Sequence, residues 1–168
     1  MKGAGRINFS LVGTYTSAFI TTPQPGASYD CAGFYGAICG APQPKWRHTF
    51  KATWETPYSG LDVSLAWRYL GKVDLDASSS NPILQLLGVN GVAATDAHFS
   101  SRSYLDMTAS MQVGEKVTLR LGINNLLDKD PPINGSTNCP TGQCNGNTWP
   151  QVYDALGRYI FMSATAKF

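Results

Sequence analysis

The sequence has little charge and no long apolar run. Asp, Glu, Lys and Arg make up 14% of its 168 residues, whereas about a quarter of a typical soluble domain is charged. The net charge is only +2 and the basic residues are scattered, which argues against nucleic-acid binding. No stretch of about 18 apolar residues occurs, so a transmembrane helix is excluded.

Residues suited to catalysis or metal binding are also scarce. The chain has only two histidines, His48 and His98, which is too few for a three-histidine metal site. The Gly-x-Ser-x-Gly and Gly-x-x-x-x-Gly-Lys motifs are missing, so neither a hydrolase nucleophile nor a phosphate-binding loop is indicated. The sequence therefore predicts no catalytic residue, metal or cofactor, and an enzyme is the last class that we consider.

The four cysteines fall in two local pairs, Cys31 with Cys39 and Cys139 with Cys144, in stretches rich in Gly, Pro and Asn. This placement favours two disulfides that each close a loop in an oxidising compartment. The alternative is a four-thiolate zinc site, but the first pair is spaced too widely for a zinc knuckle. The N-terminal segment is a poor signal peptide because polar residues interrupt it. Any export signal is therefore expected upstream of Met1.

Six segments show the alternation of a β-strand, with every second residue mostly apolar. They are residues 6–15, 45–55, 61–69, 104–113, 117–124 and 159–168. Val12 is an apolar exception in the polar row of the first segment. A soluble sandwich would alternate in the same way, so the period alone does not decide between a sandwich and a membrane barrel.

The lengths of the connections favour the barrel. Residues 21–44, 74–97 and 128–150 form long links, whereas 56–60 and 114–116 form short turns. Strict long-short alternation, with aromatic side chains near both strand ends, is typical of outer-membrane barrels, whose long loops face the exterior. We therefore predict an all-β fold, an antiparallel up-and-down meander of about six strands that is part of a larger transmembrane β-barrel.

Two stretches resemble the closing strands of TonB-dependent outer-membrane receptors. The first is Leu-Gly-Ile-Asn-Asn-Leu-Leu-Asp-Lys-Asp-Pro-Pro at 121–132, and the second is Tyr-Asp-Ala-Leu-Gly-Arg-Tyr at 153–159, followed by the terminal Phe168. Residues 67–71 and 46–50 are also similar to strands of that family. Independently of the family, Asn124, Asn125 and Asp128 can bond strand-end backbone groups, and Gly157 avoids crowding where the last strand starts.

The resemblance implies a complete barrel of about 22 strands, an N-terminal plug and a preceding energy-coupling segment, the TonB box. This sequence contains neither the plug nor that segment, so residues 1–168 are expected to be a C-terminal barrel fragment. The implied partners are outer-membrane lipid, the rest of the barrel with its plug, the barrel-assembly machinery and the inner-membrane energy-coupling complex. The implied location is the outer membrane of a Gram-negative bacterium.

The family's commonest cargo is an iron-siderophore complex, with cobalamin, haem or an oligosaccharide left open. The alternatives are a porin or adhesin wall and a secreted β-sandwich binding module. In the family, a terminal aromatic with alternating apolar residues is an assembly signal, here Ile160, Met162, Ala164, Ala166 and Phe168.

Charged residues of the polar rows are candidates to line a path for an anionic solute. Equally, they can pair with one another or with a plug and only solvate a polar interior. Lys45 belongs to this group, and the path candidates proper are Arg47, Lys51, Arg68, Arg102, Asp106 and Arg120.

Overall fold

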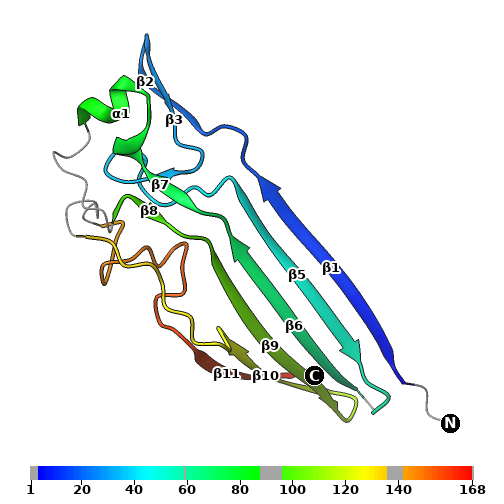
Figure 1. The fold of residues 1–168 in the computed structure, drawn as a ribbon. Coiled ribbons are helices and arrows are strands. Elements are labelled where there is room, and N and C mark those ends of the chain that lie inside the picture. The colour runs from blue at the N-terminus through cyan, green and yellow to red at the C-terminus, as the bar shows by residue number, and fades with distance from the viewer. Residues whose placement is uncertain (1–3, 59, 88–95, 136–141, 168) are drawn as a thin grey trace.

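Six long strands form one antiparallel sheet in the computed structural model, which describes residues 4–58, 60–87, 96–135 and 142–167. Each strand pairs with the long strand that follows it in the chain, so the sheet is an up-and-down meander (Figure 1). The predicted fold class is confirmed. The strands are β1 (Arg6–Tyr15), β5 (Trp46–Glu55), β6 (Leu61–Leu70), β9 (Arg102–Val113), β10 (Val117–Asn124) and β11 (Tyr159–Ala166).

Short and long connections lie at opposite ends of the sheet, as predicted (Figure 1). The turn after β5 is closed by a hydrogen bond from Thr56 N to Leu61 O of 3.0 Å, and residues 114–116 link β9 to β10. Strand alternation then places the other three links, which are long, at the opposite end. We call the end with the long links the outer end.

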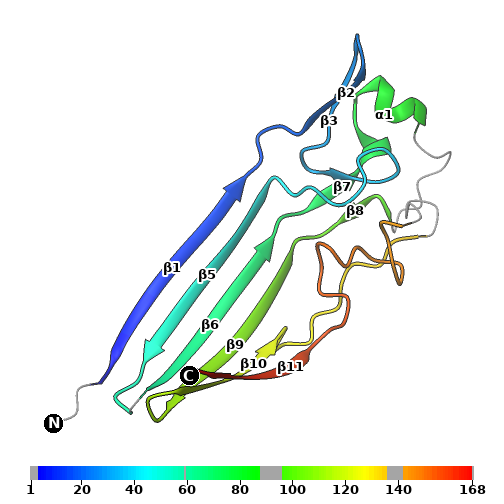
Figure 2. The same ribbon diagram turned by 180° about the vertical axis from the view of Figure 1, so that it is seen from behind.

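The long connections contain secondary structure that the sequence did not predict. Strands β2 (Ile20–Gln24) and β3 (Ala27–Asp30) form a hairpin. Strands β4 (Phe34–Tyr35), β7 (Val73–Leu75) and β8 (His98–Phe99) form a small sheet in which β4 and β7 are parallel. The 3-10 turn η1 (Asp76–Ser78) and helix α1 (Pro82–Leu87) follow β7. Together with the described residues 125–135 and 142–158, these elements form the cap (Figure 2).

The buried core lies in the cap rather than on the sheet. Six of its seven residues come from the long connections, and the seventh, Tyr104, comes from β9. The Tyr35 ring stacks on Phe99 with centroids 4.1 Å apart, and its hydroxyl donates to the carbonyl of Asp96. Burial, followed by nearby carboxylates, raises the pKa of Tyr35 far above its usual value, so this hydroxyl stays a neutral donor. The seven residues are Tyr35, Val73, Leu75, Phe99, Tyr104, Trp149 and Tyr153.

The apolar face of the sheet has no cover within the described ranges. Ile7, Phe9 and Leu11 are 58%, 69% and 65% exposed. The register aligns such residues in rows across the strands, for example Leu11 with Phe50, then Trp67, then Leu105. A β-sandwich needs a second sheet on this face, and the described residues supply none there, which disfavours the sandwich alternative. No helix among the described residues is long and apolar enough to cross a membrane.

Candidate functional site

The polar face of the sheet carries all six predicted path residues. The register places Arg47 and Arg102 in one cross-strand row and Lys51 and Asp106 in another. Arg68 and Arg120 have the same parity on β6 and β10. These residues therefore share a face, although their separations along the strands keep them from forming a single cluster.

Arg68 is the centre of an ion-pair network near the outer end. Its Nε and Nη2 donate to the two carboxylate oxygens of Asp106 at 2.6 and 3.0 Å. Its Nη1 and Nη2 donate to Asp154, in the connection between β10 and β11, at 3.0 and 2.5 Å. The guanidinium also lies 5.0 Å from the centroid of the Tyr104 ring. Two bidentate pairs fix both position and orientation of a guanidinium.

This network, which we call the Arg68 clamp, attaches the last long connection to the wall. Asp106 Oδ1 accepts a further hydrogen bond from the backbone N of Asn125, at 2.9 Å. Asp106 therefore bonds to the connection at its start, and Arg68 bonds to it near its end. Of the two alternatives for the charged residues, mutual pairing holds for Arg68 and Asp106. Asp154 is not among the residues predicted from the sequence, although it lies in the Tyr-Asp-x-x-Gly-Arg motif.

Arg47, Lys51 and Arg120 have no ion pair with any other described residue. Arg47 lines a cavity of about 210 Å³ with Val12, Arg68 and Val152. Val12, the apolar exception of its strand, lies on the polar face and lines this cavity together with Val152 of the last long connection. A free cation beside this cavity can attract an anionic solute.

Two other basic residues of the predicted set, Arg102 and Lys45, differ in burial and in position relative to their strands. The Nε of Arg102 is buried and has no hydrogen-bond partner among the described residues. Lys45, which alternation assigned to the polar row, precedes the first residue of β5 and lines a cavity with Trp46 and Tyr69. Both of these rings belong to the apolar face, but Lys45 lies outside the strand, so its place on the polar face stays a prediction. Alternation applies only within the strand.

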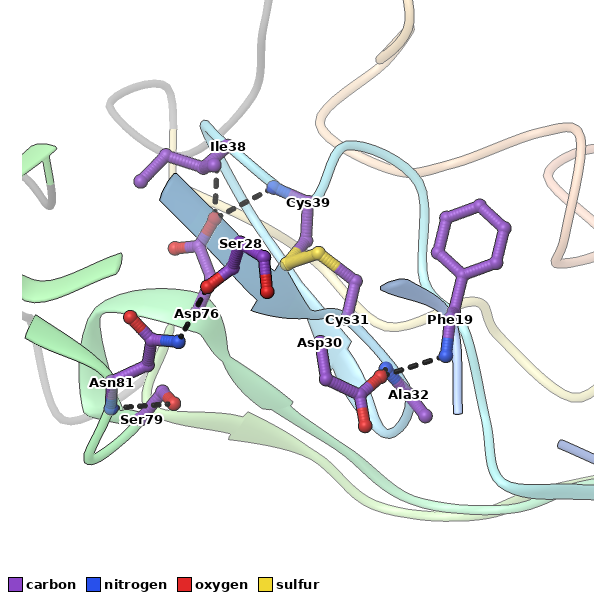
Figure 3. Close-up of a disulfide and its surroundings, with 10 residues drawn as sticks. All are labelled: Phe19, Ser28, Asp30, Cys31, Ala32, Ile38, Cys39, Asp76, Ser79 and Asn81. Carbon is purple, nitrogen blue, oxygen red and sulfur yellow. Dashed lines mark hydrogen bonds between the residues drawn. A yellow bond between two sulfur atoms is a disulfide. The ribbon is translucent and has the colours of Figure 1, made fainter. Parts of the chain in front are cut away.

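A disulfide closes the first part of the cap (Figure 3). Cys31 and Cys39 are bonded, as predicted, with Cα atoms 5.5 Å apart. Asp76, which is only 2% exposed, accepts hydrogen bonds from Ile38 N and Cys39 N at 2.8 and 3.0 Å (Figure 3). The carboxylate therefore ties the disulfide loop to η1. In the second predicted pair, Cys144 is in a disulfide, whereas Cys139 lies outside the described residues.

Two of the predicted polar residues, Asn125 and Asp128, form hydrogen bonds with backbone groups between the last two strands. Asn125 Oδ1 accepts from Lys129 N at 2.8 Å, and its Nδ2 donates to Lys129 O at 2.9 Å. Asp128 Oδ1 accepts from Arg158 N at 2.8 Å, and Gly157, with φ of +68°, makes the turn into β11. Within the described part of the chain, no such side-chain bond forms at Asn124. Residues Ile160, Met162, Ala164 and Ala166 share the apolar face of β11, while Phe168 lies outside the described residues.

Among the described residues, no group of three His, Cys, Asp or Glu side chains is arranged to hold a metal ion. No protein-family model matches the sequence, and no curated protein matches it.

A solved structure does match the fold. It is a mutant of the ferric enterobactin receptor from Pseudomonas aeruginosa, with a TM-score of 0.58 and 14% sequence identity. The superposition covers 96% of this chain and 20% of that receptor. The chain thus spans about a fifth of the receptor's length. At this identity the likeness concerns the fold alone. The six-stranded meander has the fold of part of a β-barrel receptor.

Proposed function

We propose that this chain forms the closing strands and part of the outer mouth of an outer-membrane receptor of the TonB-dependent type. The observation that carries the proposal is the contrast between the two faces of the sheet. Apolar side chains are exposed on one face, whereas charged side chains lie on the other, where Arg68 and Asp106 bond to the last long connection. In a membrane barrel, the apolar face contacts lipid and the charged face lines a polar lumen.

In this proposal the chain needs the rest of its barrel. Strands β1 and β11 each pair on one side only, so their outer edges carry unpaired backbone groups, which a membrane does not tolerate. Six strands are also fewer than the roughly eight of the smallest closed barrels. Further strands and an N-terminal plug complete the wall and the lumen, the barrel-assembly machinery inserts it, and an inner-membrane complex supplies energy through the plug.

The cargo that we propose is an iron-siderophore complex. Two features support this choice: the resemblance of residues 121–132 and 153–159 to the receptor family, and the fold shared with a ferric enterobactin receptor. The unpaired cations Arg47 and Lys51 face the lumen in this arrangement and would attract an anionic complex. The clamped cap narrows the mouth, as expected for a receptor that holds its ligand before transport.

The test is uptake of iron-55 carried by a panel of siderophores into iron-starved cells that do or do not express the intact protein. We expect uptake of at least one complex to depend on the protein and to stop when a protonophore removes the proton gradient. Uptake that depends on the protein but survives the protonophore would support a porin instead. Absence of the protein from the outer membrane would contradict the proposal as a whole.

A further inference from the structure

Two adjoining cavities lie at the outer end of the sheet, where β6 passes into the cap. Their volumes are about 550 and 390 Å³. They share Tyr69, Lys72 and Asp74 as lining residues. The first also contains His98 and Ser101, and the second contains Lys45 and Trp46. The lining residues lie on or next to five strands, β4 to β8, and we call the two cavities together the depression.

Basic side chains dominate the charge of this depression. Lys72 is exposed, and its Nζ lies 3.9 Å from Asp74 Oδ2, which is at the limit of an ion pair. The stem of Lys45 packs along Gly33, 3.1 Å from where a Cβ would stand on that glycine, so the side chain stays against the cavity wall. Asp74 is the one acidic residue among the described lining residues. Two lysines against one aspartate leave the depression with a net charge of +1.

An aromatic surface begins directly below the depression. Trp46 Nε1 donates to His48 Nδ1 at 2.9 Å, and the His48 ring contacts Trp67 edge-on, with centroids 4.7 Å apart. These three residues line an apolar hollow of about 360 Å³ together with Leu11 and Phe50. Trp46 and Tyr69 therefore lie at a boundary. Lysines and hydroxyl groups lie on the side toward the cap, and apolar side chains lie on the side toward the sheet.

We infer that this depression binds the phosphate headgroup of a lipid in the outer leaflet, while the hollow beneath it receives an acyl chain. The inference rests on the proposed function, because it needs the apolar face to lie in lipid. Lysines next to an aromatic belt attract anionic headgroups, and an ammonium is a common phosphate ligand. The hydroxyl groups of Tyr69, Ser100 and Ser101 supply further donors for the phosphate oxygens.

The test uses brominated lipids, which quench tryptophan fluorescence on contact. The intact protein is reconstituted into bilayers that contain brominated phosphatidic acid or brominated phosphatidylcholine. The quenching that disappears in Trp46→Phe reports on this site. For that signal we expect about a fivefold preference for phosphatidic acid, from a net charge of +1 near the surface. The double variant Lys45→Gln with Lys72→Gln should lower the ratio to one or less, because Asp74 is then the charged residue that remains among those described. The matched control, Lys51→Gln with Lys129→Gln, removes the same charge elsewhere and should keep the preference.

Each other outcome contradicts a defined statement. A ratio near one in the unmodified protein, or a ratio that Lys45→Gln with Lys72→Gln leaves unchanged, would overturn the lipid site and leave the proposed function intact. Loss of the preference on addition of inorganic phosphate would overturn it in favour of a soluble phosphate ligand. If neither brominated lipid quenches Trp46, the apolar face does not contact lipid, and the proposed function fails with it.

Discussion

Arg68 on β6 and Asp154 in the last long connection form a bidentate pair across 86 positions of the sequence. Arg68 is held on its other side by Asp106 of β9. The side chains of the two aspartates are 15% and 17% exposed, and that of Arg68 is 32% exposed. The described parts of this connection, 125–135 and 142–158, are therefore each attached to the polar face, at Asn125 and at Asp154.

Loss of the Asp154 charge should loosen this connection. Asp154→Asn weakens two charge-assisted hydrogen bonds in a partly buried site, so we expect a loss of about 1–2 kcal/mol in the free energy that holds the connection down. Limited proteolysis of the folded protein should then cut within 125–158 several times faster. Asp130→Asn is the control, because Asp130 is an exposed residue of the same connection. Equal cleavage rates for the two variants would contradict the role of the clamp.

A methyl group at Gly122 should collide with Phe161. The two residues pair across β10 and β11, and the nearest ring carbon lies 2.2 Å from where the Cβ would be. Gly122→Ala should therefore destabilise the wall by about 1–3 kcal/mol through overpacking, seen as a lower urea midpoint in detergent micelles. Adding Phe161→Leu should restore much of the loss. No restoration in the double variant would mean that the ring contact is not the cause.

Removal of the Asp76 carboxylate should expose the Cys31–Cys39 disulfide to reductant. Asp76→Ala leaves the amides of Ile38 and Cys39 without their acceptor, which costs about 1–3 kcal/mol for buried groups. We expect dithiothreitol to reduce this disulfide several times faster in the variant, as measured by thiol alkylation and peptide mapping. Asp74→Asn serves as the control because Asp74 lies only two residues away, on β7, whereas the two amides donate to Asp76. The account of the loop is wrong if both variants react alike.

The last residue should matter for assembly more than its neighbour. In the proposed receptor, Phe168 anchors a terminal strand that is presented to the assembly machinery, where backbone pairing gives affinity and the ring sets the register. Phe168→Ala should lower the heat-modifiable, folded fraction in purified outer membranes, whereas Lys167→Ala should do much less. Equal yields from these two variants would leave the proposed assembly signal without support.

Local patterns predicted the sheet because a strand alternates its side chains with a period of two. That period correctly assigned residues as different as Leu11 and Arg68 to opposite faces, and connection lengths gave the chain direction of each strand. The period does not decide the face of Lys45, one residue before β5 begins, because alternation does not extend beyond the strand.

The cap was beyond the reach of local patterns. Strand β4 has two residues, and β7 has three, which is too short to show a period. Their parallel pairing joins Phe34 to Asp74, forty positions apart. The pairing of Arg68 with Asp154 could not be predicted from local patterns either. Asp154 contacts Arg68 only because a long connection folds back onto the wall. The apolar exception at Val12 was a usable signal, since an apolar residue on a polar face indicates a neighbouring element, and Val12 lines a cavity with Val152.

The most direct test of the central claim, that the apolar face of the sheet lies in lipid, compares Leu11→Arg with Ser10→Arg in the intact protein. Both residues are exposed and adjacent on β1, with side chains on opposite faces. In water both substitutions would be nearly neutral, whereas an arginine on the lipid face of a membrane strand costs about 2 kcal/mol or more near the midplane. The measurement is the heat-modifiable, folded fraction in purified outer membranes. We predict a clear drop for Leu11→Arg and little change for Ser10→Arg, and equal folded fractions for the two variants would contradict the claim.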